Sequence, residues 1–262
     1  MNIPTITDAM WNGWMGKLLY VPILNILVLL YVYIPGQDLG LAIVAITLLT
    51  RIILHPSYRK TLKAQRDIQK IQPYIDKVKA EFKDDQKRQS EEMMKIYKEY
   101  KVNPLGSCLP LIIQLPIIFA LYRVFIAGLD TSSLAHLYSW FPNAPQQLHT
   151  IFLAFTNIPQ LAIDLTTRNI YLAVIAGVAQ LLQSWVTVRH TSSSSQKIGG
   201  MNTQLIFMLV FPFVTLGLAL TLPSALSLYW ATTTIIMTLE QLWVFAILDR
   251  QEKKIAEVTH YG

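Results

Sequence analysis

The sequence predicts an all-α polytopic membrane protein with five core transmembrane helices and a cytoplasmic antiparallel helical hairpin, and three observations predict it. Of the 262 residues, 53% are apolar and only 15% are charged, whereas a soluble domain carries about 25% charged residues. The apolar residues lie in blocks near the length of about 17 to 25 residues that spans a bilayer. The charges are uneven, since 13 of the 22 Lys and Arg residues lie between His55 and Asn103.

The N-terminal segment, residues 1–39, holds a first apolar stretch at 18–34 that runs for 17 residues without a charge. That length is at the lower edge for a membrane span. Its tyrosines suit a helix near the lipid headgroups. Two interpretations therefore stay open at this point, an interfacial helix and a spanning helix.

The first core span is predicted at 40–56, where an apolar run is interrupted by Arg51 and stopped by Pro56. The other four core spans are predicted at 105–126, 169–188, 204–222 and 223–248. All are too long for buried strands, which rarely exceed about eight residues.

Basic residues between the spans orient the predicted helices. The insert at 55–103, the loop at 189–203 and the tail at 249–262 together hold 18 Lys and Arg residues. The segment at 127–168 holds one, Arg168. Because cytoplasmic loops carry the excess of basic residues, we expect the insert, the loop and the C-terminus in the cytoplasm and 127–168 outside.

The charged insert has the pattern of two amphipathic helices, which we expect to pair as a hairpin over 57–104. The first helix carries an apolar stripe at Ile68, Ile71, Ile75, Val78 and Phe82, and the second carries one at Met93, Ile96, Tyr97 and Tyr100. Spacings of three and four residues are typical of helices that pack along one face. The external segment contains two shorter amphipathic pieces, Leu134–Phe141 and Gln147–Leu165.

Enzyme and cofactor signals are absent from the sequence. No glycine-rich loop ends in Gly-Lys-Ser/Thr, so the pattern that binds nucleotide phosphates is missing. The five histidines never recur at i, i+4 and have no nearby cysteine, which disfavours a metal site. We therefore expect no enzyme, no cofactor and no metal.

Arg51 is the residue that stands out. It lies eleven residues past Gly40, roughly 16 Å into a helix, where an arginine costs about 2.5–3.5 kcal/mol on insertion scales. One interpretation is a hydrated cavity in the inner leaflet around Arg51. The other is a side chain that reaches the cytoplasmic headgroups, about two turns away. The one acidic residue predicted within a span, Glu240, also lies toward the cytoplasmic side.

Other polar residues inside the predicted spans could line such a cavity. They are Gln114, Gln180, Gln183, Thr47, Thr50 and the run Thr232–Thr234. Each alone more often holds helices together by hydrogen bonds. Gln180 and Gln183 share one helical face, while Tyr229 and Trp230 suit either an interfacial anchor or a contact surface.

Three separated motifs resemble one family of membrane proteins, in the order and spacing that the family shows over about residues 35–250. They are Thr50–Pro56, the stretch from Asn103 through Pro110 and Gln114 to Arg123, and Pro223–Trp230. This pattern resembles the YidC, Oxa and Alb family of membrane protein insertases, with a basic hairpin at the matching place.

The resemblance implies five core helices around a hydrophilic groove that is open to the cytoplasm and lipid and closed to the outside. Arg51 matches the groove arginine, and Gln183 and Trp230 match other groove positions. Gln180, Gln114 and Thr50 are further groove candidates. The implied function is insertion of transmembrane segments with short polar tails into the bilayer without nucleotide hydrolysis.

The resemblance also implies a multi-pass protein of the bacterial plasma membrane. Nascent membrane proteins would be its substrates, and ribosomes, signal-recognition components and a Sec translocon are candidate partners. The basic hairpin suits anionic lipids, and no small-molecule substrate is expected. Two departures from the family are the absence of the large external domain of Gram-negative members and the uniformly apolar 18–34.

Two other functions compete with insertion. A small transporter or channel would use Arg51 and the glutamines to bind a solute, but the spans show neither the internal repeat nor the second charged partner common in transporters. A membrane scaffold whose hairpin binds a coiled coil would explain the insert but not Arg51. Reconstitution with a single-span substrate separates the three.

Overall fold

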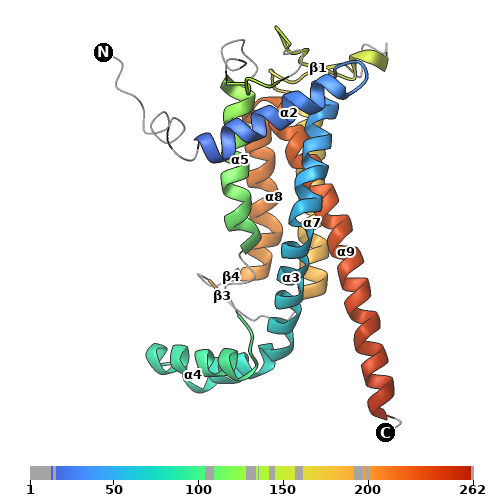
Figure 1. The fold of residues 1–262 in the computed structure, drawn as a ribbon. Helices are drawn as coiled ribbons and strands as arrows, with labels where there is room; N and C mark the ends of the chain where they lie inside the picture. Colours follow the sequence, from blue (N-terminus) through green and yellow to red (C-terminus); the bar gives the residue numbers. More distant parts are fainter. Residues whose placement is uncertain are drawn as a thin grey trace. The chain divides into compact units, whose positions relative to one another are not determined.

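The protein is built mainly from helices, as seen in a computed structural model that describes residues 13, 16–103, 109–127, 134, 136–141, 145–156, 162–191, 197–198 and 201–260 (Figure 1). The helices are η1 (Gly16–Tyr20), α2 (Val21–Tyr33), α3 (Leu39–Glu81), α4 (Gln86–Glu99), α5 (Leu109–Ala127), η3 (Ala154–Thr156), α7 (Ile170–Thr191), α8 (Thr203–Thr221) and α9 (Ser224–His260). Two short antiparallel pairs join β1 (Ile151–Phe152) to β2 (Ile163–Asp164) and β3 (Lys197–Ile198) to β4 (Met201–Asn202). The motif residues 104–108 lie outside the described residues.

Four helical segments of the described chain are long and apolar enough to cross a membrane. They are Gly16–Tyr33, Leu39–Glu81, Ile170–His190 and Ser224–Lys253. Two shorter apolar helical segments are Gln114–Phe125 and Val210–Thr221. The prediction of a mostly helical membrane protein is thereby confirmed, while the count of five core spans around a groove stays a prediction.

The chain divides into two compact units, and the long helices contribute residues to both. Unit 1 consists of Met1–Ile52, Ile112–Val178 and Thr215–Thr233, and unit 2 consists of Ile53–Leu111, Ala179–Val214 and Thr234–Gly262.

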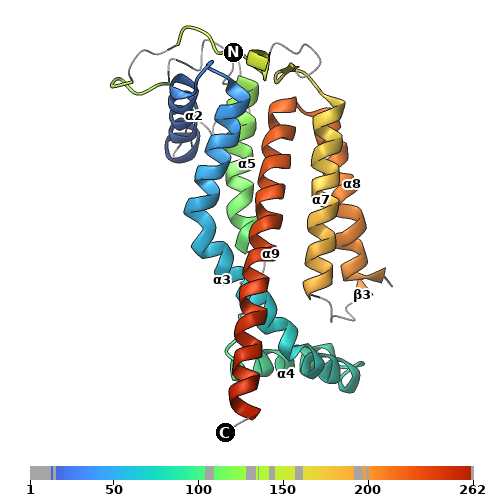
Figure 2. The same cartoon turned by 90° about the vertical axis from the view of Figure 1, so that its right-hand side faces the viewer.

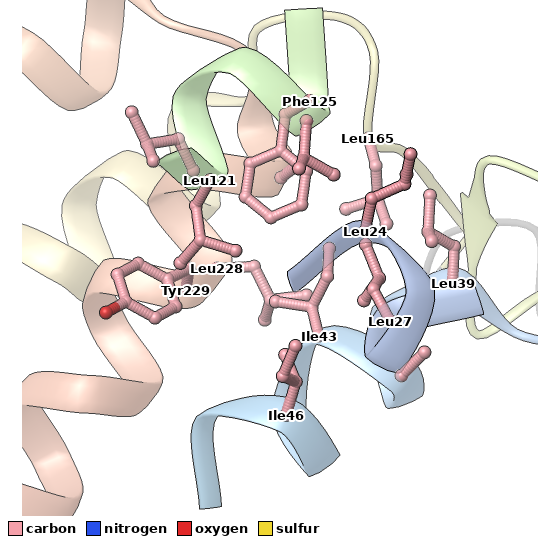
Figure 3. Packing of buried hydrophobic residues seen from close by; sticks show 14 of the residues in the cluster. Leu24, Leu27, Leu39, Ile43, Ile46, Leu121, Phe125, Leu165, Leu228 and Tyr229 are labelled. Carbon is pink, nitrogen blue, oxygen red and sulfur yellow. The ribbon is translucent and has the colours of Figure 1, made fainter. Parts of the chain in front are cut away.

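The core of unit 1 forms where α2 packs against the first half of α3. Leu24, Leu27 and Tyr31 of α2 are fully buried, together with Ile43 of α3 and Val124 of α5. Figure 3 shows side chains of these helices meeting in one apolar cluster that α9 also joins. Rather than running alongside α3, α2 crosses it at a steep angle (Figures 1 and 2).

Buried polar side chains of unit 1 hold the backbone of the described residues 136–141 and 145–156. Asn25 donates to the carbonyl oxygen of His136 over 3.2 Å and accepts from the backbone N–H of Tyr138 over 2.8 Å. The hydroxyl of Tyr31 accepts from the N–H of His149 over 2.9 Å. Because buried polar groups need partners, these contacts specify the path of these residues over α2.

Asp38 makes the third attachment, at the start of α3. Its Oδ1 accepts from the N–H of Leu41 over 3.0 Å, and its Oδ2 accepts from the N–H of Leu153 over 2.6 Å. Leu153 has a φ of 59°, a left-handed conformation that few residues other than glycine adopt. Next to it, a Cβ on Gly40 would lie 2.0 Å from Cδ2 of Phe152, so only glycine fits this close approach.

The described part of 147–165, interpreted from the sequence as an amphipathic piece, forms the β1–β2 pair and the single turn η3. It is joined to the start of α9, since Ala225 donates to the carbonyl oxygen of Leu165 over 3.0 Å and the Ser224 hydroxyl donates to that of Asp164 over 2.8 Å. The N–H of Ala225 is in the first turn of α9, where backbone N–H groups have no partner within the helix, and this contact satisfies it.

The helix α3 continues through Pro56, where the sequence predicted the first core span to stop, and through Pro73. A proline inside a helix removes one backbone hydrogen bond but does not end the helix when neighbouring packing supports it. A short turn joins α3 to α4, whose start is capped when Asp85 accepts from the N–H of Arg88 over 3.0 Å.

Two helices in the charged insert lie against each other within unit 2. Ile71 and Ile75 of the predicted stripe are 3% and 1% exposed. The Gln89 side chain donates to the carbonyl oxygens of Lys79 and Phe82, and the rings of Tyr74 and Tyr100 are 5.2 Å apart. Burial lowers the pKa of Lys79 below its ordinary value, although Asp76 acts in the opposite direction.

Candidate functional site

Arg51 is buried in unit 1 and belongs to a polar chain that joins three helices. It lies on α3 with 7% of its surface exposed, and its Nη2 donates to Oε1 of Gln114 on α5 over 3.5 Å. Nε2 of Gln114 donates to the hydroxyl of Tyr229 on α9 over 2.6 Å. We call Arg51, Gln114 and Tyr229 the arginine cluster.

Arg51 and Tyr229 together orient the Gln114 amide, which has one donor end and one acceptor end. Because the guanidinium of Arg51 can only donate, it faces the amide oxygen. The NH2 group is then directed toward the hydroxyl of Tyr229, which can accept. Figure 3 shows the Tyr229 ring among the apolar side chains of unit 1 with its hydroxyl directed out of that cluster.

Thr50 was also predicted for the site, and its hydroxyl forms a hydrogen bond within its own helix. Its Oγ1 donates to the carbonyl oxygen of Thr47 over 2.9 Å, and Thr47 in turn donates to that of Ile43 over 2.6 Å. Such back-bonding satisfies a hydroxyl in an apolar setting. Thr50 is half-buried and lies next to Arg51 along α3.

Trp230 lies in unit 1, packed against small residues. It is partly buried against a cluster of alanines, Ala173, Ala176, Ala219 and Ala231, with Leu216. Nearby, a Cβ on Gly177 would lie 3.3 Å from Leu216, so α7 and α8 approach closely in this unit. Small residues at such contacts are typical of helices packed in membranes.

Gln183 takes part in a second polar chain, which lies in unit 2. Its Nε2 donates to Oε1 of Gln241 over 2.7 Å, and its Oε1 accepts from the hydroxyl of Thr238. Nε2 of Gln241 lies 3.2 Å from Oγ1 of Thr187. We call Gln183, Thr187, Thr238 and Gln241 the glutamine cluster, which joins α7 to α9.

The structure thus divides the predicted site residues between the two units. Thr50, Arg51, Gln114 and Trp230 belong to unit 1, and Gln180 and Gln183 belong to unit 2. Arg51 and Gln114 are in contact. Gln180 lies one turn before Gln183 on α7 and is 9% exposed. Their joint role in one groove stays a prediction.

Sequence reasoning missed Tyr229, Thr187, Thr238 and Gln241. One signal was present, because Gln183 and Thr187 are four residues apart and Thr238 and Gln241 are three apart, so each pair shares a helix face. Tyr229 was interpreted with Trp230 as either an interfacial anchor or a contact surface, but it was not predicted for the groove.

Glu240, the acidic residue that the sequence placed within a span, contacts a histidine. Its Oε1 lies 2.5 Å from Nδ1 of His55, and its side chain is 9% exposed. Among the described residues, no group of three or more His, Cys, Asp or Glu side chains gathers in a way that could hold a metal ion.

Comparison with known proteins shows a family model and several named relatives to which this chain is similar. The family model described as 60Kd inner membrane protein matches residues 29–252. The protein called membrane protein insertase YidC from Nitratidesulfovibrio vulgaris (strain DP4) is 30% identical over 248 residues, which cover 93% of this chain and 40% of the relative. The protein of the same name from Oleidesulfovibrio alaskensis is 30% identical over 241 residues, covering 91% of this chain and 40% of the relative.

A solved structure described as an active YidC insertase with its first transmembrane domain resolved is 27% identical. It matches with a TM-score of 0.49, covering 89% of this chain and 46% of that one. The chain therefore spans less than half the length of these relatives.

Proposed function

The chain belongs to the 60Kd inner membrane protein family, and from this premise we propose that it is a membrane protein insertase. It moves transmembrane segments with short polar tails from the cytoplasm into the bilayer through a hydrated groove, without nucleotide hydrolysis. The observation that carries this function is the arginine cluster, a permanently charged side chain buried within a span and hydrogen-bonded to a neutral amide.

The magnitudes favour a role for the charge of Arg51. An acidic residue carried through the centre of a bilayer costs about 2.5–3.5 kcal/mol on insertion scales. Opposite charges about 4 Å apart attract by about 4 kcal/mol at an effective dielectric constant of 20. One arginine in a wet groove can therefore offset the cost of one acidic residue in the incoming tail.

The other groove residues have the chemistry to keep the path polar. Gln114, Gln180 and Gln183 offer amide donors and acceptors, Thr50 lies beside Arg51, and Trp230 supplies an amphipathic ring. The apolar part of a substrate then enters the lipid and gains about 25 cal/mol for each Å² removed from water. That gain is the driving force of a step that uses no nucleotide.

We infer a topology of five core spans with the hairpin and C-terminus in the cytoplasm, supported by the 18 basic residues on that side against one outside. The steep crossing of α2 over α3 favours an interfacial position for 18–34 on the outer side (Figure 1). Nascent membrane proteins are the substrates. Ribosomes, signal-recognition components and a Sec translocon are proposed partners, and the hairpin binds anionic headgroups.

Reconstitution tests this function directly. We expect the purified protein in liposomes to insert a single-span substrate with a short acidic tail, so that the tail becomes protected from external protease without added ATP. Empty liposomes measure spontaneous insertion. Protection no greater than in empty liposomes contradicts the proposal, and uptake of a small solute by the same vesicles indicates a transporter instead.

Replacing Tyr229 with Phe tests whether its hydroxyl holds the Gln114 amide in place beside Arg51. The variant keeps the buried ring but loses the hydroxyl bond of 2.6 Å, which is typically worth about 0.5–1.5 kcal/mol. We expect insertion of an acidic-tail substrate to slow by about threefold to tenfold, while a neutral-tail substrate is unaffected.

Tyr31→Phe is the matched control, because it also removes a buried tyrosine hydroxyl bond in unit 1, the bond to His149. It is expected to leave the dependence on tail charge unchanged. Equal slowing of acidic and neutral tails by Tyr229→Phe would mean that Tyr229 acts only by packing.

A further inference from the structure

A stretch of α3 and a stretch of α9 run side by side within unit 2, in the same direction. Residue numbers increase in the same direction along both helices, because His55 contacts Glu240 and Arg66 contacts Asp249. Between these contacts, Tyr58 and Leu62 of α3 are buried with Val244 and Phe245 of α9. We call α3 residues 55–70 the hairpin stem.

The upper end of this pairing is formed by His55. Its Nδ1 lies 2.5 Å from Oε1 of Glu240, and its ring lies 5.7 Å from that of Trp243. The Glu240 side chain is 9% exposed, against 35% for His55. A nearly buried carboxylate needs such a partner.

The middle of the pairing is apolar. Leu62, Val244 and Phe245 are each 1% exposed, and Met237 and Leu248 of α9 pack against the same cluster. Burial on this scale is typical of a permanent helix contact and differs from the loose contact of a mobile arm.

The lower end is a group of four charged side chains. Arg66 donates to Asp249 and, over 3.2 Å, to Glu252, while Nζ of Lys70 lies 2.8 Å from Glu252. The hydrogen bond from Lys70, with the Arg66 contacts adding to it, lowers the pKa of Glu252 below its ordinary value although partial burial opposes this. The carboxylate is therefore charged at neutral pH. Single exposed ion pairs contribute little, but a network around one partly buried arginine contributes more.

The length of α9 brings these acids to the stem. Its 37 residues extend over about 55 Å at 1.5 Å per residue, whereas the hydrocarbon core is about 30 Å thick. The last turns of α9 therefore lie outside the hydrocarbon. There Asp249 and Glu252 contact the basic stem, while Arg250 and Lys253 are exposed.

We propose that the cytoplasmic extension of α9 is a docking surface for the hairpin stem and that this contact sets the direction in which the hairpin leaves the membrane during insertion. The stem is held, so movement of the hairpin to receive a substrate begins beyond Lys70. The role in insertion rests on the proposed function, whereas the docking itself does not.

Spin-label distances in the full chain, reconstituted in liposomes, test the docking. Labels are attached to cysteines replacing the exposed Lys63 and Ala246 in a Cys108→Ala background. We expect one narrow distance distribution, which becomes broad when Asp249→Lys and Glu252→Lys are introduced. Adding Arg66→Glu and Lys70→Glu restores opposite charges and returns the narrow distribution.

Asp84→Lys with Glu91→Lys is the matched control, because it makes the same charge change at exposed positions of the insert. It is expected to leave the distribution narrow. An unchanged distribution in the Asp249→Lys, Glu252→Lys variant overturns the docking.

Insertion measured in the same vesicles separates this inference from the proposed function. We expect the rate to fall on the order of fivefold in the Asp249→Lys, Glu252→Lys variant and to recover in the fourfold variant. An unchanged rate with a broadened distance overturns the role of docking in insertion. If the distance distribution broadens and narrows with the charge changes as expected, but the protein inserts no substrate, the proposed function is overturned and the docking stands.

Discussion

Arg51→Ala is expected to slow insertion of a substrate with an acidic translocated tail by at least about tenfold, which corresponds to about 1.4 kcal/mol. The variant removes the charge that offsets the cost of the tail carboxylates in the bilayer. Arg51→Lys largely preserves insertion, because it keeps a positive charge at the same depth. The measurement is protease protection of the tail in the reconstituted system, over a series of tails with zero, one and two acidic residues.

The dependence on tail charge is the decisive readout of this series. Substrates with neutral tails are expected to insert at similar rates into vesicles that contain the unchanged protein or Arg51→Ala, because neutral tails gain little from a fixed charge. Arg88→Ala provides a matched control, since Arg88 is an exposed arginine on α4. Full activity of Arg51→Ala on the acidic tails would refute the role of Arg51 but not the family membership.

Asp38→Ala is expected to lower the free energy of unfolding by about 2–4 kcal/mol. The change removes a helix cap, typically worth about 1 kcal/mol, and leaves the buried N–H of Leu153 without its acceptor, which costs about 1–3 kcal/mol. Asp38 is 3% exposed, so water replaces the lost bonds poorly. Thermal unfolding in detergent micelles measures the loss, and proteolysis within 145–156 is expected to accelerate.

Asp164→Ala provides the comparison for Asp38. Asp164 also accepts a backbone N–H, that of Thr166 over 2.9 Å, but it is exposed, so its loss is expected to cost less than about 1 kcal/mol. Asp38→Asn keeps the size of the side chain and one acceptor oxygen. Its loss in free energy of unfolding is expected to lie between those of Asp38→Ala and Asp164→Ala. Equal effects of Asp38→Ala and Asp164→Ala would show that the Leu153 attachment contributes nothing to stability.

The candidate site shows how far sequence reasoning reached. Arg51 and Gln114 were found because a polar residue inside an apolar run is costly and therefore noticeable. Tyr229 was missed because its chemistry is ordinary at a span end and becomes special only when its hydroxyl meets the Gln114 amide. Gln183 was found, but its partners Thr238 and Gln241 were not.

The charged insert shows the same limit. The stripe that includes Ile71 and Ile75 predicted buried positions, and both are buried. The topology count used only the Lys and Arg residues of the tail, so its acids had no part in the sequence argument, although Asp249 and Glu252 contact Arg66. Nothing in a linear pattern indicates that two helices separated by some 180 residues run in parallel with this offset.

The sequence by itself determined that this protein is a helical membrane protein, where a charge lies within its apolar runs, and which family it resembles. These properties are local, because apolar length, helical period and motif spacing depend on neighbouring residues. The tertiary structure decided the partners of the polar groups, such as Gln114 for Arg51 at a separation of 63 residues and Glu240 for His55 at 185. Such pairs depend on the rotation and offset of packed helices, to which a hydrogen bond is sensitive within less than an ångström.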